Sequence, residues 1–400
     1  MEKQNVSSFS GGLLWFGAAV SIAEIFTGTL IAPLGISKGI TAIILGHVIG
    51  VMLLYLAGLI GAESKLPAIE SSRISFGKYG SYLFSILNIL QLIGWTAVMI
   101  IVGAKSMDYV TMTMSNYSNM ALWCIVIGAL IVIWIIVGIK NLSKVNVFAV
   151  GGLFVLTIIL STLVFKSTNA IKVEGTMTFG MAFELSVIMP LSWLPLISDY
   201  TRFAKKARQS TLVSSLSYFV GSTWMYIIGL GAAIYAGTSD VAQIMTSAGL
   251  GIAAVIVIVF ATVTTTFLDA YSAGVSFTNV SRKINEKTAA VIVCIVGILI
   301  AIFTPIEQYQ DFLALIGSVF APMITILIID YFIFKKRDTS DIINISNIIL
   351  WGVGVIIYRV FLKIDTIVGS TIPVIIIVGI LYIILNGGKN YVRKSIRKSQ

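Results

Sequence analysis

Long runs of apolar residues, separated by short polar segments, dominate the chain from about residue 11 to about residue 386. Each run has about 20 residues, the length that a helix needs to cross the hydrocarbon core of a bilayer. The first run is too long for a signal peptide and lacks an Ala-x-Ala site, so we expect it not to be cleaved. The pattern predicts twelve membrane-spanning helices, at about 11–34, 39–62, 80–104, 121–139, 146–165, 180–199, 212–236, 250–273, 287–304, 312–334, 344–362 and 367–386.

Composition supports an integral membrane protein without a soluble domain. The chain is 58% hydrophobic and 11% charged, whereas soluble proteins carry roughly 25% charged residues. The longest polar segments, about 63–79 and 105–120, are too short to fold alone. Residues 1–400 are therefore expected to form a single transmembrane domain.

Most of the 27 Lys and Arg residues fall in the even-numbered loops and the two terminal segments. Positive residues accumulate in cytoplasmic segments, so we expect both termini to be cytoplasmic and the membrane to be the plasma (inner) membrane. The net charge of +10 then faces anionic lipid and requires no nucleic-acid partner.

Glu24 lies in the middle of the first apolar run. A carboxylate at that depth costs several kcal/mol unless it faces a cavity or a partner, and it is a candidate functional residue by default. The neighbouring small residues, including Gly17 and Gly28, allow the helix to loosen or to approach another helix closely.

The sixth run contains two prolines, Pro190 and Pro195, at membrane depth. Each removes a backbone donor and disturbs the local helix. A five-helix period would place this interruption opposite that of the first run, giving inverted repeats at about 11–165 and 180–334, with peripheral helices at about 344–386. Paired interruptions of this kind mark the central site of many transporters; an ordinary proline kink is the alternative.

Gln91 and Trp95 are four residues apart in the third run and share a helix face. An indole plane beside an amide suits a flat heterocycle that forms hydrogen bonds. The alternative is a buried tryptophan beside a glutamine that bonds another helix.

The eighth run carries hydroxyls at Thr264 and Thr265, followed by Asp269 one turn later. Hydroxyl oxygens beside loosened carbonyls can coordinate a monovalent cation, although membrane threonines often bond their own backbone. Asp269 is expected either to act in proton coupling or gating, or to pair with a cation at the helix end.

Other polar residues in the runs have a structural interpretation. We expect Asp199 to pair with Arg202 or cap backbone, Asp330 to meet Lys335 or Lys336, and Glu184 to be structural. The single histidine, His47, has either a packing role or a proton or gating role.

An enzymatic function is not expected. One histidine and two separated cysteines, Cys124 and Cys294, cannot supply a metal cluster. No phosphate-binding Gly-x-x-x-x-Gly-Lys-Ser/Thr motif occurs, which argues against ATP hydrolysis. No cofactor is expected besides a coupling ion.

Four stretches resemble the cytosine permease group of nucleobase–cation symporters, and the resemblance extends over essentially the whole chain. Within the group, the compact length and the Glu24 region resemble the hydroxymethylpyrimidine permease branch, which is linked to uptake of a thiamine precursor. The stretches are 17–28, 75–81 leading to Gly94-Trp95, Ser192 with 199–203, and Thr264-Thr265 with 271–274.

The resemblance implies an all-α, LeuT-like fold: about twelve helices in a five-plus-five inverted repeat, broken first and sixth helices, and two peripheral helices. It implies a base stacked on Trp95, with Ser192 on the sixth helix. It also implies a sodium site formed by backbone carbonyls of the first helix and by carbonyl and hydroxyl oxygens of the eighth, at Gly17, Val20, Ala261, Thr264 and Thr265.

The sequence departs from that group where the base is read. The family's asparagine falls at Ala261, its glutamine at Leu92 beside Gln91, and its second aromatic at Pro190, where Trp193 is a possible replacement. Some other group must then read the base. A carboxylate can accept from the amino group of an aminopyrimidine in a charge-assisted bond, so we expect Glu24 to do so.

These observations predict a secondary active transporter that imports a pyrimidine, hydroxymethylpyrimidine, with Na⁺ by alternating access. One alternative is a cytosine or purine permease coupled to Na⁺ or H⁺. Another is a channel, which more often shows polar rings from several subunits. The expected partners are the small-molecule substrate and the lipid bilayer.

Overall fold

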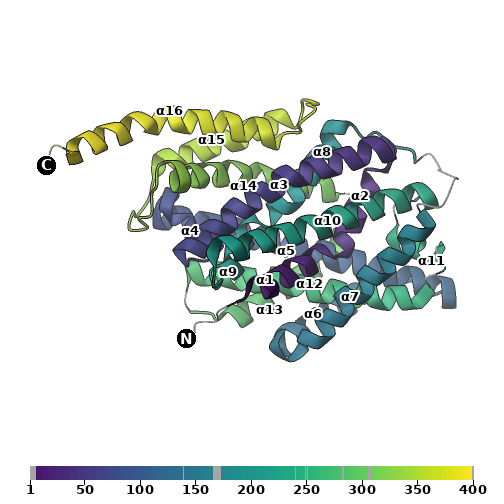
Figure 1. Ribbon diagram of the computed structural model, residues 1–400. Coiled ribbons are helices and arrows are strands. Elements are labelled where there is room, and N and C mark those ends of the chain that lie inside the picture. The colour runs from purple at the N-terminus through teal and green to yellow at the C-terminus, as the bar shows by residue number, and fades with distance from the viewer. Residues whose placement is uncertain are drawn as a thin grey trace.

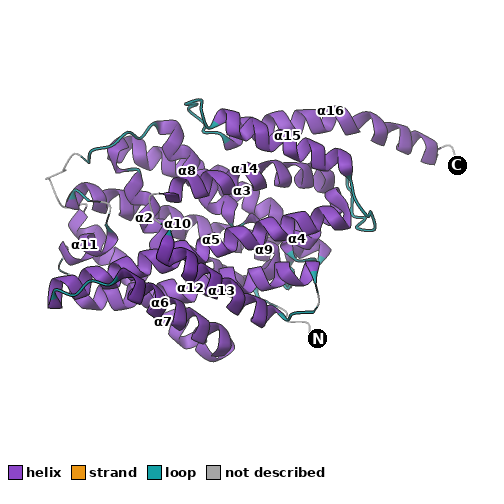
Figure 2. Ribbon diagram, turned by 180° about the vertical axis from the view of Figure 1, so that it is seen from behind, coloured by secondary structure: helices purple, strands orange, loops and turns teal. Residues whose placement is uncertain are grey.

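The computed structural model describes residues 6–398, except 138, 165–172, 239, 248, 250, 282 and 305–307. In this part of the chain the regular structure is helical, apart from one isolated parallel bridge between Val6 and Ala204, and the long helices run roughly along a common direction (Figures 1 and 2). The principal helices are α1 (Ser8–Ala19), α2 (Ile22–Leu30), α3 (Ile36–Ser64), α4 (Ala68–Ser71), α5 (Arg73–Ser115), α6 (Met120–Val137), α7 (Ile139–Val164), α8 (Phe179–Ser192), α9 (Leu194–Thr201), α10 (Ala207–Ala236), α11 (Val241–Ser247), α12 (Gly251–Val280), α13 (Glu286–Phe303), α14 (Tyr309–Ile328), α15 (Ile345–Phe361) and α16 (Thr371–Lys398).

The apolar runs of the sequence coincide with these helices. Among the described residues, eight helices are long and apolar enough to cross a membrane, and the bent pair α1–α2 makes a ninth. Three shorter apolar helices, Val150–Thr162, Ile345–Phe361 and Thr371–Asn386, correspond to the remaining runs. The predicted all-helical membrane fold is confirmed, while the count of twelve crossings stays a prediction.

The first predicted helix is broken in its middle, as expected. α1 ends at Ala19 and α2 begins at Ile22, with a bend of 50° between them. Val20 (φ −80°, ψ 77°) and Ser21 (φ −134°, ψ 158°) leave the helical region. The backbone groups that this break releases can face a ligand.

The sixth predicted helix is interrupted more gently. Trp193 separates α8 from α9 but keeps near-helical dihedral angles (φ −88°, ψ −7°). Its N–H donates to the carbonyl of Pro190 at 3.2 Å, three residues earlier, which is a tightened 3₁₀-type turn. The whole segment Phe179–Thr201 remains one span, bent by less than 40°.

Two groups of helices pack around the centre of the molecule. The first bundle consists of α1, α2, α3, α8, α9 and α10, and the second of α5, α6, α12 and α13, with α7 against both α10 and α12. α2 and α10 approach backbone to backbone: a Cβ at Gly28 would lie 2.3 Å from the Tyr226 carbonyl oxygen, and one at Gly229 would lie 2.0 Å from that of Ile25. These glycines let the helix that carries Glu24 lie directly on α10.

α15 and α16 form a peripheral pair that packs on α14 (Figure 1). Hydrogen bonds to Glu184 of α8 connect this pair to the first bundle. Glu184 accepts hydrogen bonds from the backbone N–H groups of Ser370 (2.8 Å) and Thr371 (3.0 Å) and from the hydroxyl of Tyr358. A carboxylate at the start of α16 is also favourable for the helix dipole, in agreement with the predicted structural role.

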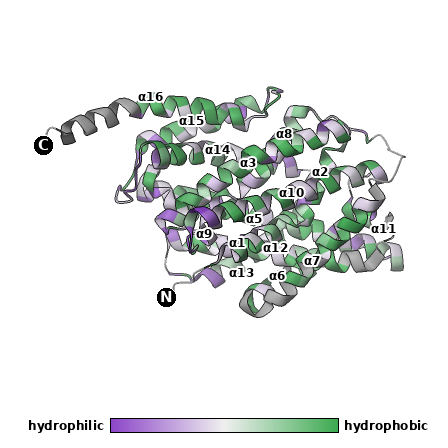
Figure 3. Ribbon diagram, viewed as in Figure 1, coloured by the Kyte–Doolittle hydropathy of each residue, from purple (hydrophilic) through white to green (hydrophobic). Residues whose placement is uncertain are grey.

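Hydrophilic residues gather at the end of the molecule where α4, α9 and the start of α1 lie (Figure 3). Lys65, Arg73 and Arg202 flank α4 and α9, and this end is called here the basic end. There Asp199 accepts from the N–H of Ala68 at 2.9 Å, capping α4 as predicted. Lys65 Nζ donates to the Ala204 carbonyl at 3.2 Å. The predicted Asp330–Lys336 pair also forms, at 2.7 Å.

Candidate functional site

A small cavity, called here the central cavity, lies where the break in the first helix and the joint in the sixth face α5 and α12. Its volume is about 20 Å³, which is room for about one water molecule. A ring-shaped ligand therefore requires the walls to separate. The cavity is lined by Ser21, Ala23, Glu24, Trp95, Met99, Met189, Ser192, Trp193, Thr265 and Asp269.

The structure brings together many of the positions singled out in the sequence. Six of them line the central cavity, from four separate predicted helices: Glu24, Trp95, Ser192, Trp193, Thr265 and Asp269. The binding roles assigned to them remain predictions. Reasoning from sequence missed the small and sulfur-containing wall residues, because nothing distinguishes them from ordinary core positions.

Two tryptophans give this site aromatic walls on opposite bundles. Trp95 of the second bundle is held edge-to-face against Tyr309 and Phe312, with ring centroids 6.0 and 5.6 Å away. Trp193 packs in the same way against Trp15, at 5.5 Å. These edge contacts fix the ring planes and leave both rings on the lining of the cavity.

Gln91 lies beside the cavity rather than on its wall. Its Nε2 donates to the carbonyl of Ser192 at 3.1 Å and to Oδ1 of Asn88 at 2.9 Å, while its Oε1 has no hydrogen-bond partner among the described residues. The Ser192 hydroxyl donates to the Met189 carbonyl at 2.7 Å. Gln91 therefore connects the second bundle by a hydrogen bond to the junction between α8 and α9. Asn88, three residues before Gln91, was overlooked in the sequence although it shares that face.

Glu24 is buried, with 1% of its surface exposed, and both of its oxygens form hydrogen bonds. The Tyr218 hydroxyl donates to Oε1, and the Ser222 hydroxyl pairs with Oε2, each at 2.7 Å. His47 Nε2 lies 2.7 Å from the same Ser222 oxygen. Neither α10 residue was predicted from the sequence, although their spacing of four in an apolar run indicates a polar helix face.

The residues expected to hold a cation are divided between the cavity wall and its surroundings. Thr265 lines the central cavity, and its hydroxyl has no hydrogen-bond partner among the described residues. Thr264 donates instead to the carbonyl of Ala261 at 3.0 Å. Val20 stands in the helix break, where no described backbone N–H donates to its carbonyl. Gly17 lies beside Val150 of α7.

The acidic residue of α12 does not form the ion pair that was one of its two predicted roles. Within the described part of the chain, no Lys or Arg pairs with Asp269, which is 5% exposed and lines the central cavity. Nor do three His, Cys, Asp or Glu side chains come together there as metal ligands. The oxygen-bearing side chains on the lining of the central cavity are hydroxyls and the two carboxyl groups of Glu24 and Asp269.

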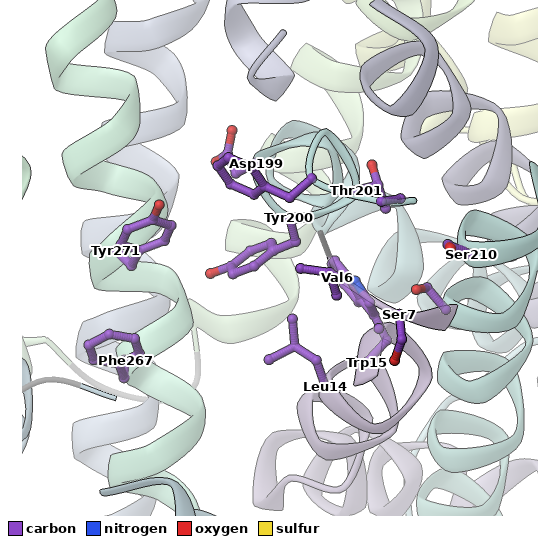
Figure 4. A pocket seen from close by; sticks show the side chains of 14 residues that line it. Val6, Ser7, Leu14, Trp15, Asp199, Tyr200, Thr201, Ser210, Phe267 and Tyr271 are labelled. Carbon is purple, nitrogen blue, oxygen red and sulfur yellow. The ribbon is translucent and has the colours of Figure 1, made fainter. Parts of the chain in front are cut away.

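A larger cavity of about 350 Å³, the vestibule, opens at the basic end between α1, α9, α10 and α12 (Figure 4). Tyr200 of α9 points toward Tyr271 of α12, with ring centroids 5.8 Å apart. Trp15 lines the vestibule and Trp193 lines the central cavity. Their edge-to-face contact therefore lies between the two spaces, where it can act as a barrier.

The whole sequence and the fold have known relatives. Residues 3–347 match the family model described as permease for cytosine/purines, uracil, thiamine, allantoin. The cytosine permease of Escherichia coli (strain K12) is 26% identical over 332 residues, covering 82% of this chain and 77% of the relative. The hydantoin permease of Microbacterium maritypicum is 23% identical over 389 residues, covering 88% and 78%.

Among solved structures, the chain resembles Mhp1, a nucleobase-cation-symport-1 family transporter, in a closed conformation with bromovinylhydantoin bound. The TM-score is 0.81 at 20% identity, covering 98% of this chain and 94% of that one. This similarity confirms the predicted LeuT-like fold. Because the family model spans most of the sequence, the chain belongs to the family of nucleobase:cation symporters and is a multi-pass membrane transporter rather than an enzyme.

Proposed function

We propose that this protein imports an aminopyrimidine, hydroxymethylpyrimidine, together with Na⁺ by alternating access across the plasma membrane. The observation that carries the proposal is the composition of the central cavity: two tryptophans from opposite bundles and two acidic residues, of which Glu24 faces them from the broken first helix. Both termini are proposed to be cytoplasmic, so that the vestibule at the basic end faces the cell interior.

The aromatic walls favour a flat ring. Trp95 and Trp193 stand on opposite bundles, so separating the bundles would open a slot into which a planar heterocycle can stack. The relatives include proteins named cytosine permease and hydantoin permease. Cytosine and hydantoin are both small flat heterocycles, which supports this substrate class.

The surroundings of Glu24 support the proposal that the substrate ring carries an amino group. A carboxylate oxygen has two lone pairs, and each oxygen of Glu24 receives one hydrogen bond from α10. One acceptor direction on each oxygen therefore remains for a ligand. An exocyclic amine donates to such an acceptor in a charge-assisted bond, while Ala261 offers no side-chain group for base recognition.

Sodium coupling is supported by two oxygen atoms that have no hydrogen-bond partner in the described part of the chain. The Val20 carbonyl and the Thr265 hydroxyl, from the two bundles, are without hydrogen-bond donors or acceptors in the described part of the chain. Buried polar groups normally find partners, and a bound cation would satisfy both kinds of oxygen. The same cation would link α1–α2 to α12 and so couple its binding to bundle movement.

A ligand panel on the purified transporter tests the proposal. Thermal stability is measured with hydroxymethylpyrimidine, cytosine, uracil, hypoxanthine and hydantoin, each in NaCl and in choline chloride at equal ionic strength. Hydroxymethylpyrimidine should stabilise the protein in NaCl by about 2.7 kcal/mol at 100 times its Kd, and much less in choline chloride. Stabilisation by another base alone, or an equal effect in both salts, would contradict the substrate or the ion respectively.

The second candidate is a cytosine or purine permease, favoured by the 26% identity to a cytosine permease. It predicts that cytosine or hypoxanthine gives the largest stabilisation in the same panel. Uptake into proteoliposomes that saturates with substrate and requires an ion gradient separates either carrier from a channel.

A further inference from the structure

Three side chains from three helices form a continuous hydrogen-bonded chain inside the first bundle. His47 of α3 places Nδ1 2.8 Å from the carbonyl oxygen of Ile43 and Nε2 2.7 Å from Oγ of Ser222 in α10. The same Oγ lies 2.7 Å from Oε2 of Glu24 in α2. His47 and Ser222 are fully buried and Glu24 is 1% exposed.

The positions of the hydrogens in this chain follow from counting donors. A carbonyl oxygen only accepts, so the Nδ1 atom of His47 must carry a hydrogen. Ser222 has one hydroxyl hydrogen but two neighbours at 2.7 Å, Nε2 of His47 and Oε2 of Glu24. Its hydrogen can serve only one of these contacts, and the other contact must receive a hydrogen from the neighbour itself.

With a single added proton, only two arrangements satisfy all the contacts. If Ser222 donates to Glu24, then Nε2 of His47 also carries a hydrogen and the ring is an imidazolium beside a carboxylate. If Ser222 donates to His47, then Glu24 is a carboxylic acid and donates to Ser222. Both arrangements contain one proton more than a neutral histidine and an ionised glutamate, and without it two acceptors would face each other at 2.7 Å.

No other charge in the surroundings replaces this proton. The ion pairs in the described part of the chain, Arg73–Glu70, Arg208–Glu63 and Lys336–Asp330, lie outside the network. The titratable side chains that face it are Tyr218 from α10, which donates to Glu24, Tyr226 against the His47 ring, Tyr309 of α14, which bonds Thr27 in α2, and Asp269 across the central cavity.

We propose that Glu24, Ser222 and His47 form a proton-binding triad that holds one proton within the membrane and moves it between Glu24 and His47. The transfer is balanced at each atom. The proton on Oε2 of Glu24 passes to Oγ of Ser222 while the hydroxyl proton of Ser222 passes to Nε2 of His47. Forward transfer turns a neutral acid and imidazole into a carboxylate and imidazolium, and the reverse step restores them.

The triad sets the charge that Glu24 presents to the central cavity. All three members belong to the first bundle, whereas the opposite wall of the cavity belongs to α5 and α12. Movement of the second bundle or entry of an ion can therefore change the field at Glu24 without breaking the triad. A cation or an amino group at the cavity favours the carboxylate and drives the proton to His47.

The single histidine of the chain allows a direct test without any substrate. The protein is labelled with ¹⁵N-histidine, purified on an affinity tag that lacks histidine, and placed in lipid nanodiscs. ¹⁵N NMR over pH 5–10 reports the protonation of each ring nitrogen of His47. In parallel, infrared spectroscopy follows the protonated-carboxyl band, assigned to Glu24 by its loss in Glu24→Gln.

At neutral pH we expect a hydrogen on Nδ1 and one extra proton, seen either as the imidazolium or as the Glu24 carboxyl band. If the proton is shared between the two groups, the imidazolium signal and the carboxyl band are both fractional, and the two fractions add up to one proton. An unprotonated Nδ1, a neutral ring together with an ionised Glu24, or both groups fully protonated would each overturn the proposal.

Two substitutions on α10 supply the coupling test and its control. Ser222→Ala should make His47 and Glu24 titrate independently, and Ser222→Thr, which retains a hydroxyl, should restore their joint titration. Ser215→Ala removes another buried hydroxyl of the same helix and should leave both titrations unchanged. Equal titration curves for wild type and Ser222→Ala would contradict the proposal. Because no substrate is present, this result is independent of the outcome of the ligand panel.

Discussion

The hydroxyl of Tyr218 donates a hydrogen bond to Oε1 of Glu24 at 2.7 Å, across 194 residues of sequence. Tyr218→Phe removes this donor from a buried carboxyl group while preserving the ring. Loss of one partner of a buried polar group costs about 1–3 kcal/mol, so we expect that decrease in unfolding free energy. Thermal or denaturant unfolding in detergent measures it, and Tyr79→Phe on an exposed ring is the matched control, expected to change stability by less than about 0.5 kcal/mol.

Glu24→Gln keeps the size of the side chain and replaces one acceptor oxygen by an amide donor. If Glu24 accepts from the amino group of the substrate, uptake of labelled hydroxymethylpyrimidine should weaken about 10- to 100-fold, corresponding to about 1.5–3 kcal/mol for a bond to a charged group. The assay uses cells that cannot synthesise this pyrimidine. Asp338→Asn, which removes an exposed charge from the loop before α15, is the control, and wild-type affinity in Glu24→Gln would exclude the assigned role.

Trp95→Leu removes the aromatic wall contributed by the second bundle. Stacking of a base on an aromatic side chain is worth about 1–3 kcal/mol, so substrate affinity should fall about 10- to 100-fold. Trp351→Leu is the matched control, because Trp351 packs on Phe84 and donates to the Val319 carbonyl away from the central cavity. Equal affinity losses in the two variants would point to a general packing effect.

Thr264→Ala combined with Thr265→Ala should abolish the stimulation of transport by sodium while the protein stays folded. The Thr265 hydroxyl has no partner among the described side chains, so a cation is its expected contact. Thr266→Ala on the next position is the control, since that hydroxyl donates to the Thr262 carbonyl at 2.7 Å. Uptake measured in sodium and in choline media decides the question, and unchanged stimulation in the double variant rejects the sodium site.

Gly28→Ala should destabilise the first bundle, because the added Cβ would lie 2.3 Å from the carbonyl oxygen of Tyr226. Overpacking of this kind costs about 1–3 kcal/mol, or more where backbone must move. Gly352→Ala in α15 has no heavy atom within 4 Å of the new Cβ and should be neutral or slightly stabilising. If both substitutions have equal effects on thermal unfolding, the close approach of α2 and α10 is not a constraint on stability.

Much of the architecture and part of the site could be predicted from residue type alone. Run length and hydropathy are local properties, and transfer of each segment into a bilayer depends on little else. The same holds for the loosening of the first run, where small residues surround Glu24, and for Glu24 and Asp269 themselves, whose carboxyl groups are costly at membrane depth. Residue type singled out Glu24, Trp95, Thr265 and Asp269, and the resemblance to nucleobase–cation symporters added Ser192 and Trp193; all six line the central cavity.

The pairing of those residues was decided by the tertiary structure. Gln91 bonds the Ser192 carbonyl instead of lining the cavity, and α8 and α9 form one span without the sharp bend of the first helix, because Trp193 stays near-helical. The partners of Glu24 come from α10 and, through Ser222, from α3. Such contacts depend on the rotation and depth of whole helices, which are set by close backbone packing at glycines. Hydropathy places each helix in the membrane but leaves its rotation free, and that rotation determines which polar groups meet.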